Sequence, residues 1–389
     1  MKTIESELIV VGFGPAGLGA ILRAHQAGYK NIYVVDPSPN RGSGGLDGVQ
    51  IESNSPGNDF TLPYVQALLQ SPDEDLYQRI LNAPEAAPLH GAGSPVPLTQ
   101  AAEFLRHVAE VFVAEGIVHH IQEDAAKIVI TSDGYRVITS SQASNVPAQT
   151  IEAPHIIFAP GGEEVILTEL LESRSADKVF TSRDILSHNE RFDELCEHFS
   201  RTPSLYDRPN VAVVGGSHGA YSTIDELLKV LPLGARINIY KKSPTRPFFE
   251  SIEDAESHGY LVGDHDDVCP DSGNVNRWDG VRGTARTVWC EQQKGGHNLR
   301  DHYIPLSNIP PHIPVVQATG YTPRKLALVN EMGVALDYEV RPAEGEFASV
   351  HVGNIPLRGA FAVGIGHSGR DGTNVYPQQA GEALALIRL

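Results

Sequence analysis

Short apolar runs that end in glycine-rich turns are the dominant pattern along the chain, and the clearest lies near its amino end. Four consecutive apolar residues, Leu8 to Val11, predict a short strand that is buried on both faces. The turn Gly12–Gly17 follows, and a helical stretch then runs to about Ala27 and stops at Gly28. A second apolar run, Ile32 to Val35, predicts another strand, so this part of the chain predicts a β–α–β unit.

Three glycines of this turn have the spacing Gly-x-Gly-x-x-Gly, and each position has its own physical requirement. Gly12 permits a tight turn, Gly14 lets the backbone approach a pyrophosphate, and Gly17 lets helix and strand pack closely. The helix that begins near Pro15 and Ala16 offers free N–H groups and a positive dipole end to phosphates. The turn therefore predicts a dinucleotide site, and an ordinary glycine-rich turn is the alternative.

An acidic residue ends the second strand of this unit. Asp36 lies 24 residues after Gly12 and can accept hydrogen bonds from a ribose diol. A carboxylate at this position suits an adenosine ribose that carries no 2′-phosphate. The first unit therefore predicts FAD as its dinucleotide.

The same unit recurs in the middle of the chain. Val211 to Val214 predicts one strand, Ile237 to Tyr240 predicts the next, and a helix lies between them. Ser217 stands where the first unit has Gly14. The spacing of Gly215, Ser217 and Gly219 also matches the Gly-x-Ser-x-Gly nucleophile elbow of a hydrolase, but the first unit would have no role in such an enzyme. The turn itself reads Gly215, Gly216, Ser217, His218 and Gly219.

A basic pair, not an acid, follows the second strand of this repeat. Lys241 and Lys242 can hold a 2′-phosphate, so the second unit predicts NADPH. The alternative is a degenerate repeat that no longer binds a nucleotide, because Ser217 has a side chain where a diphosphate would approach.

Further elements can be placed coarsely from the same periodicities. A helix is predicted over Thr99 to Glu115, with Thr99 as its N-cap and an apolar stripe through Phe104, Leu105, Val108, Val111 and Phe112. Small residues follow a strand that begins at Ile313, and among them Thr319 and Gly320 are expected to line a nucleotide. Segment 250–308 shows weak periodicity and is predicted to be irregular. The other predicted elements are strands at the start of 155–162 and 361–366 and a last helix over 377–389.

Composition and charge narrow the classes of function. The 389 residues hold 30 Lys and Arg against 48 Asp and Glu, a net charge of −18, which disfavours nucleic acid and anionic membranes as partners. At roughly 150 residues per domain, this length predicts two domains or three. No signal peptide or membrane-spanning run is visible at the start of the sequence, so a cytoplasmic protein is expected.

Cysteine and histidine usage argues against a metal site. Three cysteines, Cys196, Cys269 and Cys290, are far apart and form no Cys-x-x-Cys pair. The densest cluster of potential ligands, Asp264–Asp267, lacks a fixed ligand spacing and is interpreted as a solvated loop. The pair His119 and His120 is expected at the surface, and no metal is predicted.

Four motifs occur in an order that resembles a known family. They are Gly12–Gly17, residues 213–220, Pro247-Phe-Phe-Glu250 and Ala318-Thr-Gly-Tyr321. The set resembles the flavin-dependent N-hydroxylating monooxygenases, the ornithine and lysine N-hydroxylases, within the flavoproteins with two dinucleotide-binding domains. The resemblance implies an α/β fold with two Rossmann-like domains, in which an NAD(P)H-binding domain (171–334) is inserted into an FAD domain (1–170 and 335–389).

The resemblance also implies chemistry and a third contact region. NADPH would reduce the flavin, O₂ would add to form a C4a-hydroperoxyflavin, and one oxygen would pass to the nitrogen of a small amine. A terminal helix in this architecture directs its N-terminus to the flavin, where Asn374 and the backbone near Gln378 would make contacts. The cofactor carries the chemistry, so no catalytic residue is nominated.

Two departures from the family pattern keep other functions open. Ser217 replaces a glycine, and the asparagine that follows the Pro-Phe element in the family is missing after Phe248. One alternative is an NAD(P)H-dependent FAD oxidoreductase or oxidase without oxygen insertion. The other is a nucleotide-sensing protein with a regulatory flavin. Neither the amine nor the oligomeric state follows from the sequence.

Overall fold

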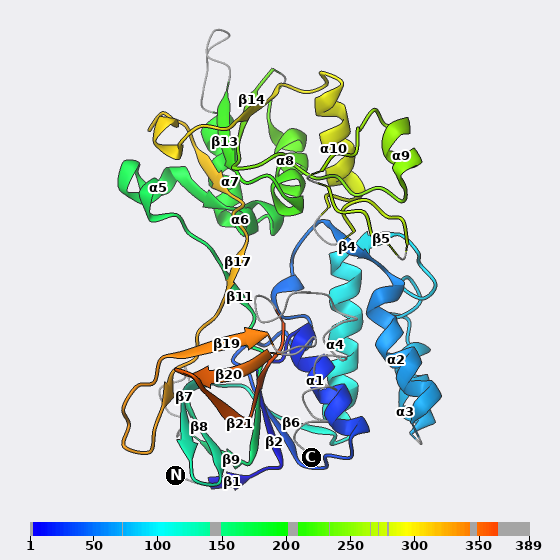
Figure 1. Ribbon diagram of the computed structural model, residues 1–389, viewed down its shortest axis with the longest axis vertical. Coiled ribbons are helices and arrows are strands. Elements are labelled where there is room, and N and C mark those ends of the chain that lie inside the picture. Colours follow the sequence, from blue (N-terminus) through cyan, green and yellow to red (C-terminus); the bar gives the residue numbers. More distant parts are fainter. Residues whose placement is uncertain are drawn as a thin grey trace. The chain divides into compact units, whose positions relative to one another are not determined.

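The chain divides into two compact units in the computed structural model (Figure 1). The structure describes residues 3–71, 73–140, 149–200, 209–232, 234–264, 266–270, 272–277, 280–342 and 348–364. Unit 1 comprises 1–47, 55–163 and 321–389, and unit 2 comprises 48–54 and 164–320. The boundaries expected from the sequence, 170/171 and 334/335, lie later than the observed 163/164 and 320/321, and the sequence did not anticipate that Gly48–Asn54 joins unit 2.

Unit 1 is built on a seven-stranded sheet in the order β19-β20-β21-β10-β2-β3-β6. The strand β2 lies between β10 and β3, and these pairings are parallel, which confirms the predicted α/β class. The strands of this sheet are β2 (Leu8–Val11), β3 (Ile32–Val35), β6 (Val118–Ile121), β10 (His155–Phe158), β19 (Tyr338–Pro342), β20 (Ala348–Val352) and β21 (Ile355–Ala362).

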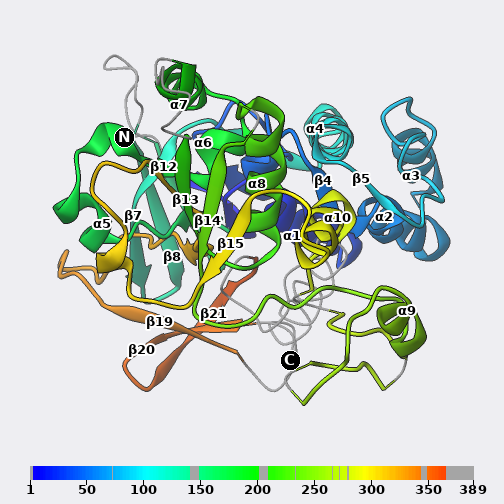
Figure 2. The same cartoon turned by 90° about the horizontal axis from the view of Figure 1, so that it is seen from above.

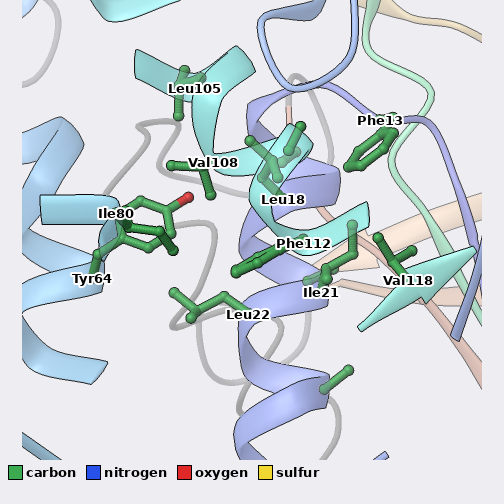
Figure 3. Close-up of a cluster of buried hydrophobic side chains, with 14 of the residues drawn as sticks. Phe13, Leu18, Ile21, Leu22, Tyr64, Ile80, Leu105, Val108, Phe112 and Val118 are labelled. Carbon is green, nitrogen blue, oxygen red and sulfur yellow. The ribbon is translucent and has the colours of Figure 1, made fainter. Parts of the chain in front are cut away.

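Both faces of this sheet are covered, as the apolar run of β2 predicted. Leu8 and Val10 pack with the helices α1 (Pro15–Gln26) and α4 (Leu98–Ala114), whose side chains fill the core shown in Figure 3. Ile9 packs on the opposite side, against a second sheet of five strands. That sheet has the order β1-β9-β8-β7-β18 and consists of β1 (Thr3–Glu5), β7 (Asp124–Thr131), β8 (Gly134–Ser140), β9 (Thr150–Ala153) and β18 (Leu328–Val329).

The helix α4 confirms the stripe predicted from its sequence. Phe104, Leu105, Val108 and Phe112 are buried, and Phe112 faces α1 in Figure 3. Val111, the fifth predicted member of the stripe, is only half-buried. The N-cap is Pro97, not Thr99. The remaining elements of unit 1 and its connections are η1 (Gly44–Leu46), β4 (Glu52–Pro56), α2 (Asn58–Gln70), α3 (Glu74–Leu81), β5 (Pro95–Pro97), β11 (Gly162–Glu164) and β17 (Tyr321–Pro323), of which β4 starts within unit 2 and β11 ends there.

Unit 2 repeats the same architecture with a five-stranded parallel sheet. Its strands follow the order β12-β16-β13-β14-β15, and Figure 2 shows β13, β14 and β15 beside the helices α8 and α10. Alternate residues of β13 again face two cores, since Val213 packs with α8 and Val214 packs on the other face. The elements are α5 (Thr168–Ser173), η2 (Ala176–Lys178), β12 (Val179–Thr181), α6 (Ser182–Leu186), α7 (Glu190–Ser200), β13 (Asn210–Val214), α8 (His218–Val230), β14 (Arg236–Tyr240) and β16 (Val315–Gln317).

The prediction that 250–308 is irregular is wrong for much of that segment. It contains α9, α10, β15 and η3, of which α10 buries the short stripe Ala285, Val288 and Trp289 against unit 2. α9, β15 and η3 are too short for a periodic signal, and in α10 the stripe is a single i, i+3, i+4 set whose burial depends on partners elsewhere in the chain. Their bounds are α9 (Ile252–Ser257), α10 (Gly283–Gln293), β15 (Leu299–His302) and η3 (Leu306–Asn308).

Two further expectations concern the ends of the chain and the membrane. The predicted helix over 377–389, with Asn374 and Gln378, lies outside the described residues. Within the described ranges, no helix is both long and apolar enough to cross a membrane.

Candidate functional site

Two glycines of the first turn are required by the packing of the chain itself. Gly12 has φ +109°, and a Cβ there would lie 2.0 Å from the carbonyl oxygen of Ala159. A Cβ at Gly17 would lie 2.1 Å from the carbonyl oxygen of Gly12. A side chain at Gly12 would push the turn away from the chain that follows β10, and one at Gly17 would push the helix away from the turn, so both positions require glycine.

Gly14 has no such explanation within the chain. Its φ of −85° suits any residue, and a Cβ there would meet only the Cα of Gly44, at an ordinary 3.6 Å. The helix α1 that begins next has no side-chain cap and no acid in its first turn. A bare backbone beside an uncapped helix N-terminus fits the close approach of a pyrophosphate.

Asp36 ties the end of β3 to this turn. Its Oδ2 accepts a hydrogen bond from the backbone N–H of Phe13 over 2.6 Å, and its Oδ1 accepts one from Ser38 over 2.7 Å. Each carboxylate oxygen has capacity for a further hydrogen bond. The side chain can therefore fix the turn and still receive the hydroxyl groups of a ribose.

His120 belongs to this site, and sequence reasoning missed it. The pattern placed it at the surface together with His119, which is exposed, but His120 packs its ring against Phe13 at a centroid distance of 5.2 Å. Its Nε2 lies 3.1 Å from the backbone oxygen of Asp36, and burial lowers its pKa. Its buried Nδ1 has no hydrogen-bond partner among the described residues. Only the pairing of β3 with β6 brings it here.

The second turn repeats the tight approach of the first. Gly215 has φ +142°, and a Cβ there would lie 2.2 Å from the carbonyl oxygen of Ala318, at the end of β16. Ala220 occupies the place of the third glycine and is buried against that turn. Ala318 therefore lies beside the turn, and the role of the next residues, Thr319 and Gly320, at a nucleotide stays a prediction. Thr319 donates its hydroxyl to the backbone oxygen of Val165 over 2.7 Å.

Gly219 and Gly320 both have open space where a Cβ would be. Gly320 has φ +88°, which favours glycine, and accepts a backbone hydrogen bond from Val165 over 3.0 Å. Neither a close backbone nor a side chain explains Gly219. Its position in the first turn of α8 leaves room for a ligand there.

Ser217 and His218 form the start of α8. Ser217 is the N-cap, with φ −99°, is exposed, and makes no side-chain capping bond. His218 accepts a hydrogen bond at Nδ1 from the backbone N–H of Arg282 over 3.3 Å. Burial, with a smaller effect of the Arg282 guanidinium, lowers the pKa of His218 to about 4. The imidazole is therefore neutral at neutral pH, so the positive charge that this turn offers to an anion comes from the helix N-terminus and not from this side chain.

The two lysines after β14 have different environments. Lys241 is buried and forms an ion pair with Asp301, with Nζ and Oδ2 2.6 Å apart. Lys242 is exposed. The expectation that both hold a 2′-phosphate did not anticipate this pairing, because Asp301 follows much later in the sequence, on the neighbouring strand β15.

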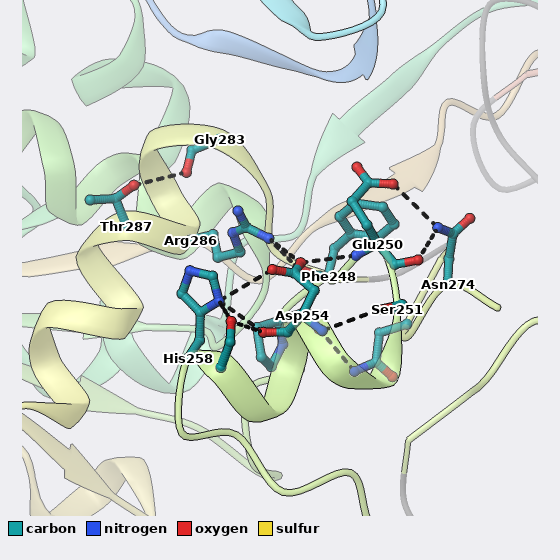
Figure 4. Close-up of polar contacts among 12 residues, drawn as sticks. Phe248, Glu250, Ser251, Asp254, His258, Asn274, Gly283, Arg286 and Thr287 are labelled. Carbon is teal, nitrogen blue, oxygen red and sulfur yellow. Dashed lines mark hydrogen bonds and ion pairs between the residues drawn. The ribbon is translucent and has the colours of Figure 1, made fainter. Parts of the chain in front are cut away.

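The segment between β14 and α10 is held by polar contacts (Figure 4). Arg286 of α10 donates to the backbone oxygen of Phe248 over 2.9 Å and lies 3.6 Å from the carboxylate of Asp254. Asp254 also accepts from the backbone N–H of Glu250 over 3.1 Å, and Ser251 caps α9. These bonds give the Pro-Phe element a defined place in unit 2.

The acidic cluster at 264–267 has a structural role where it is described. Asp266 accepts hydrogen bonds from the Tyr260 hydroxyl over 2.6 Å and from Asn276 Nδ2 over 2.8 Å. His265, the histidine of the cluster, lies outside the described residues. Over the described ranges, no group of three His, Cys, Asp or Glu residues could hold a metal ion.

The chain is similar in sequence and fold to known hydroxylases, although no family model matches it. A CMP-5'-(3-aminopropyl)phosphonate hydroxylase from Streptomyces rubellomurinus is 24% identical over 307 residues, which are 72% of this chain and 66%, just under two thirds, of that relative. An ornithine N-hydroxylase from Kutzneria sp. 744 superimposes with a TM-score of 0.61 at 13% identity, over 99% of both chains. The chain has the fold of the N-hydroxylating flavoproteins.

The same fold occurs in reductases. A bacillithiol disulfide reductase from Staphylococcus aureus superimposes with a TM-score of 0.55 at 12% identity, over 99% of both chains. The predicted pair of Rossmann-type domains is thereby confirmed. At these sequence identities the solved structures show the fold alone, and the type of reaction must be argued from the residues of the site.

Proposed function

We propose that the protein is an FAD-dependent, NADPH-using monooxygenase that hydroxylates the nitrogen of a small amine. The observation that carries this proposal is the repeated strand–turn–helix unit, with a bare Gly14 and an acid in the first copy and a basic residue after the second. The similar hydroxylase acts, by its name, on an aminopropylphosphonate joined to CMP, and the ornithine N-hydroxylase was solved with FAD, NADP⁺ and ornithine. Both supporting relatives thus act on compounds that contain a primary amine.

In this proposal unit 1 holds FAD and unit 2 holds NADPH. The N-terminus of α1 and the backbone at Gly14 would bind the FAD pyrophosphate, and Asp36 would bind its adenosine ribose. The N-terminus of α8, next to Ser217 and Gly219, would bind the diphosphate of NADPH. Bound FAD would supply the activation of O₂ and the transfer of one oxygen atom, which no amino-acid side chain provides.

The protein residues have binding roles in this scheme, not acid–base roles. Asp36 would orient the ribose, while the hydrogen bond that it accepts from the backbone N–H of Phe13 fixes the turn. His218, neutral at neutral pH, accepts the Arg282 N–H at Nδ1 and so holds the start of α10 next to the start of α8. The ring therefore keeps the second turn in place without adding a charge to it.

Oxygen incorporation tests the proposal. Purified protein is supplied with NADPH, ¹⁸O₂ and one amine in each reaction. The amines are ornithine, lysine, 3-aminopropylphosphonate and its CMP derivative. The expected product is a hydroxylamine that carries one ¹⁸O, formed with one of these amines. Formation of hydrogen peroxide alone with every amine would favour the oxidase, and NADPH-dependent reduction of a disulfide or dye under anaerobic conditions would favour the reductase. A protein that binds flavin and turns over none of these would be the nucleotide sensor.

A further inference from the structure

The ammonium group of Lys241 is fully occupied by contacts within unit 2. Its Nζ lies 2.6 Å from Oδ2 of Asp301, donates to the hydroxyl of Thr245 over 3.1 Å, and lies over the ring of Tyr303, 5.6 Å from its centroid. An ammonium group has three N–H donors and no acceptor. Two of these donors therefore have acceptors, the Tyr303 ring lies nearby, and the side chain is only 3% exposed.

These contacts belong to a closed ring of five side chains. The Thr245 hydroxyl donates to the Tyr221 hydroxyl (3.4 Å), which donates to Gln292 Oε1 (2.8 Å). Gln292 Nε2 then donates to Oδ1 of Asp301 (3.0 Å), the carboxylate that also pairs with Lys241. Each link joins a donor to an acceptor, and the members Lys241 and Thr245 are buried, so breaking a link to either of them removes a partner from a buried polar group.

The ring lies directly behind the second glycine turn. A Cβ at Gly216 would be 3.2 Å from Cβ and 3.1 Å from Cδ of Lys241, so the turn packs on the aliphatic part of this side chain. Lys241 thereby supports the backbone of the turn by packing. Its charge is paired with Asp301 and is not available to an anion that binds at the turn.

Lys242 is the member of the pair that remains available. It is exposed, and no hydrogen bond or ion pair to it is formed by the described residues. The register that pairs Tyr240 with Val214 places the end of β14 at the same sheet edge as Gly215. That edge is where a Rossmann-type domain receives the adenosine ribose of its coenzyme.

We infer that Lys242 alone selects a 2′-phosphorylated adenine nucleotide, whereas Lys241 is a positioning residue that holds the second turn. This inference rests on the nucleotide site proposed for unit 2. The sequence suggested that both lysines bind the 2′-phosphate, whereas the inference assigns this role to Lys242 and a structural role to Lys241.

Titration with two half-coenzymes tests the inference without flavin turnover. 2′,5′-ADP and 5′-ADP are titrated by calorimetry into the full chain and into Lys242→Met and Lys241→Met, at fixed ionic strength. Lys242→Met should weaken 2′,5′-ADP by about 10-fold or more and change 5′-ADP by less than about 2-fold, because only one charge-assisted contact is lost. Lys241→Met should change both affinities by the same factor and lower the melting temperature.

Thr245→Val is a second control that breaks the same ring without removing a charge. It should also leave the ratio of the two dissociation constants as in the wild type. The preference is the dissociation constant of 5′-ADP divided by that of 2′,5′-ADP. The inference is overturned if Lys242→Met keeps the preference of the wild type, or if only Lys241→Met lowers it. A wild type that binds 5′-ADP as tightly as 2′,5′-ADP overturns it as well but keeps a nucleotide site. A wild type that binds neither removes the proposed NADPH site itself.

Discussion

The carboxylate of Asp36 holds the first glycine turn by accepting the backbone N–H of Phe13 at 2.6 Å. The same side chain is thus part of the turn's structure and the proposed ligand of the ribose. These two roles can be separated by comparing an Asp36 variant with a variant that loses backbone hydrogen bonds elsewhere on the same strands, since only the first should lose bound FAD.

Asp36→Asn should lower both FAD content and stability. The Asn amide presents one acceptor oxygen where the carboxylate has two, so either Phe13 or Ser38 loses its partner, at a cost of about 1–3 kcal/mol. Flavin absorbance relative to protein absorbance measures FAD, and urea unfolding measures stability. Glu7→Met is the control that loses backbone hydrogen bonds away from the turn, since Oε2 of Glu7 accepts the backbone N–H groups of both Lys30 and Asn31, at the opposite ends of the same strands. Equal flavin loss in both variants would contradict the role of Asp36.

Gly14 and Gly17 should respond differently to alanine. Gly14→Ala adds a Cβ that meets only ordinary contacts, so the free energy of unfolding of the FAD-free protein should change by less than about 0.5 kcal/mol while FAD is lost. Gly17→Ala drives a Cβ to 2.1 Å from a backbone oxygen and should destabilise the FAD-free protein by about 1–3 kcal/mol or more. Comparing unfolding of the FAD-free variants with their FAD content checks both. A Gly14→Ala protein that retains its flavin would refute the pyrophosphate contact.

Local patterns predicted the scaffold of both units because their signals are local. Leu8 to Val11 and Ile32 to Val35 are the strands β2 and β3 to the residue, since each run is apolar on both faces and bounded by turn residues. The roles of His120 and Lys241 could not be read in this way. Each depends on which strand lies next to which: β6 beside β3, and β15 beside β14.

The contribution of Gly48–Asn54 to unit 2 shows the same limit. Glu52 accepts a hydrogen bond from Thr284 N at the start of α10 over 3.2 Å, and Gln50 donates from its backbone to Leu186 over 2.8 Å. Nothing in the composition of 48–54 distinguishes it from an ordinary loop, because its partners lie far away in sequence. Sequence reasoning therefore assigned it to the first domain.

His218 should make stability depend on pH in acid. Its pKa is lowered from the usual 6.5 to about 4, so between these values the unfolded state binds more protons than the folded state. The stabilisation is fully present above pH 6.5 and is lost as the pH falls toward 4, for a total of about 1–3 kcal/mol. Urea unfolding at pH 4.5, 5.5, 6.5 and 7.5 measures this slope. His218→Gln, which keeps an acceptor for Arg282, should show a shallower slope than the wild type, and identical slopes would contradict the neutral, buried imidazole.

Asn276 should be a stability determinant of the segment between β14 and α10. It is fully buried and donates from Nδ2 to the backbone oxygen of Pro247 (3.0 Å) and to Asp266 (2.8 Å), while its Oδ1 accepts from Asp267 N (3.0 Å). Its φ of +51° lies in the left-handed region, which asparagine and glycine tolerate better than alanine.

Asn276→Gly removes the three hydrogen bonds and should lower the free energy of unfolding by about 2–3 kcal/mol. Asn276→Ala removes the same bonds and adds backbone strain, so it should cost about 1 kcal/mol more than the glycine variant. Urea unfolding of the two variants isolates the strain, because the lost bonds are common to both, and an alanine variant as stable as the glycine variant would show that the backbone at 276 is not left-handed in solution.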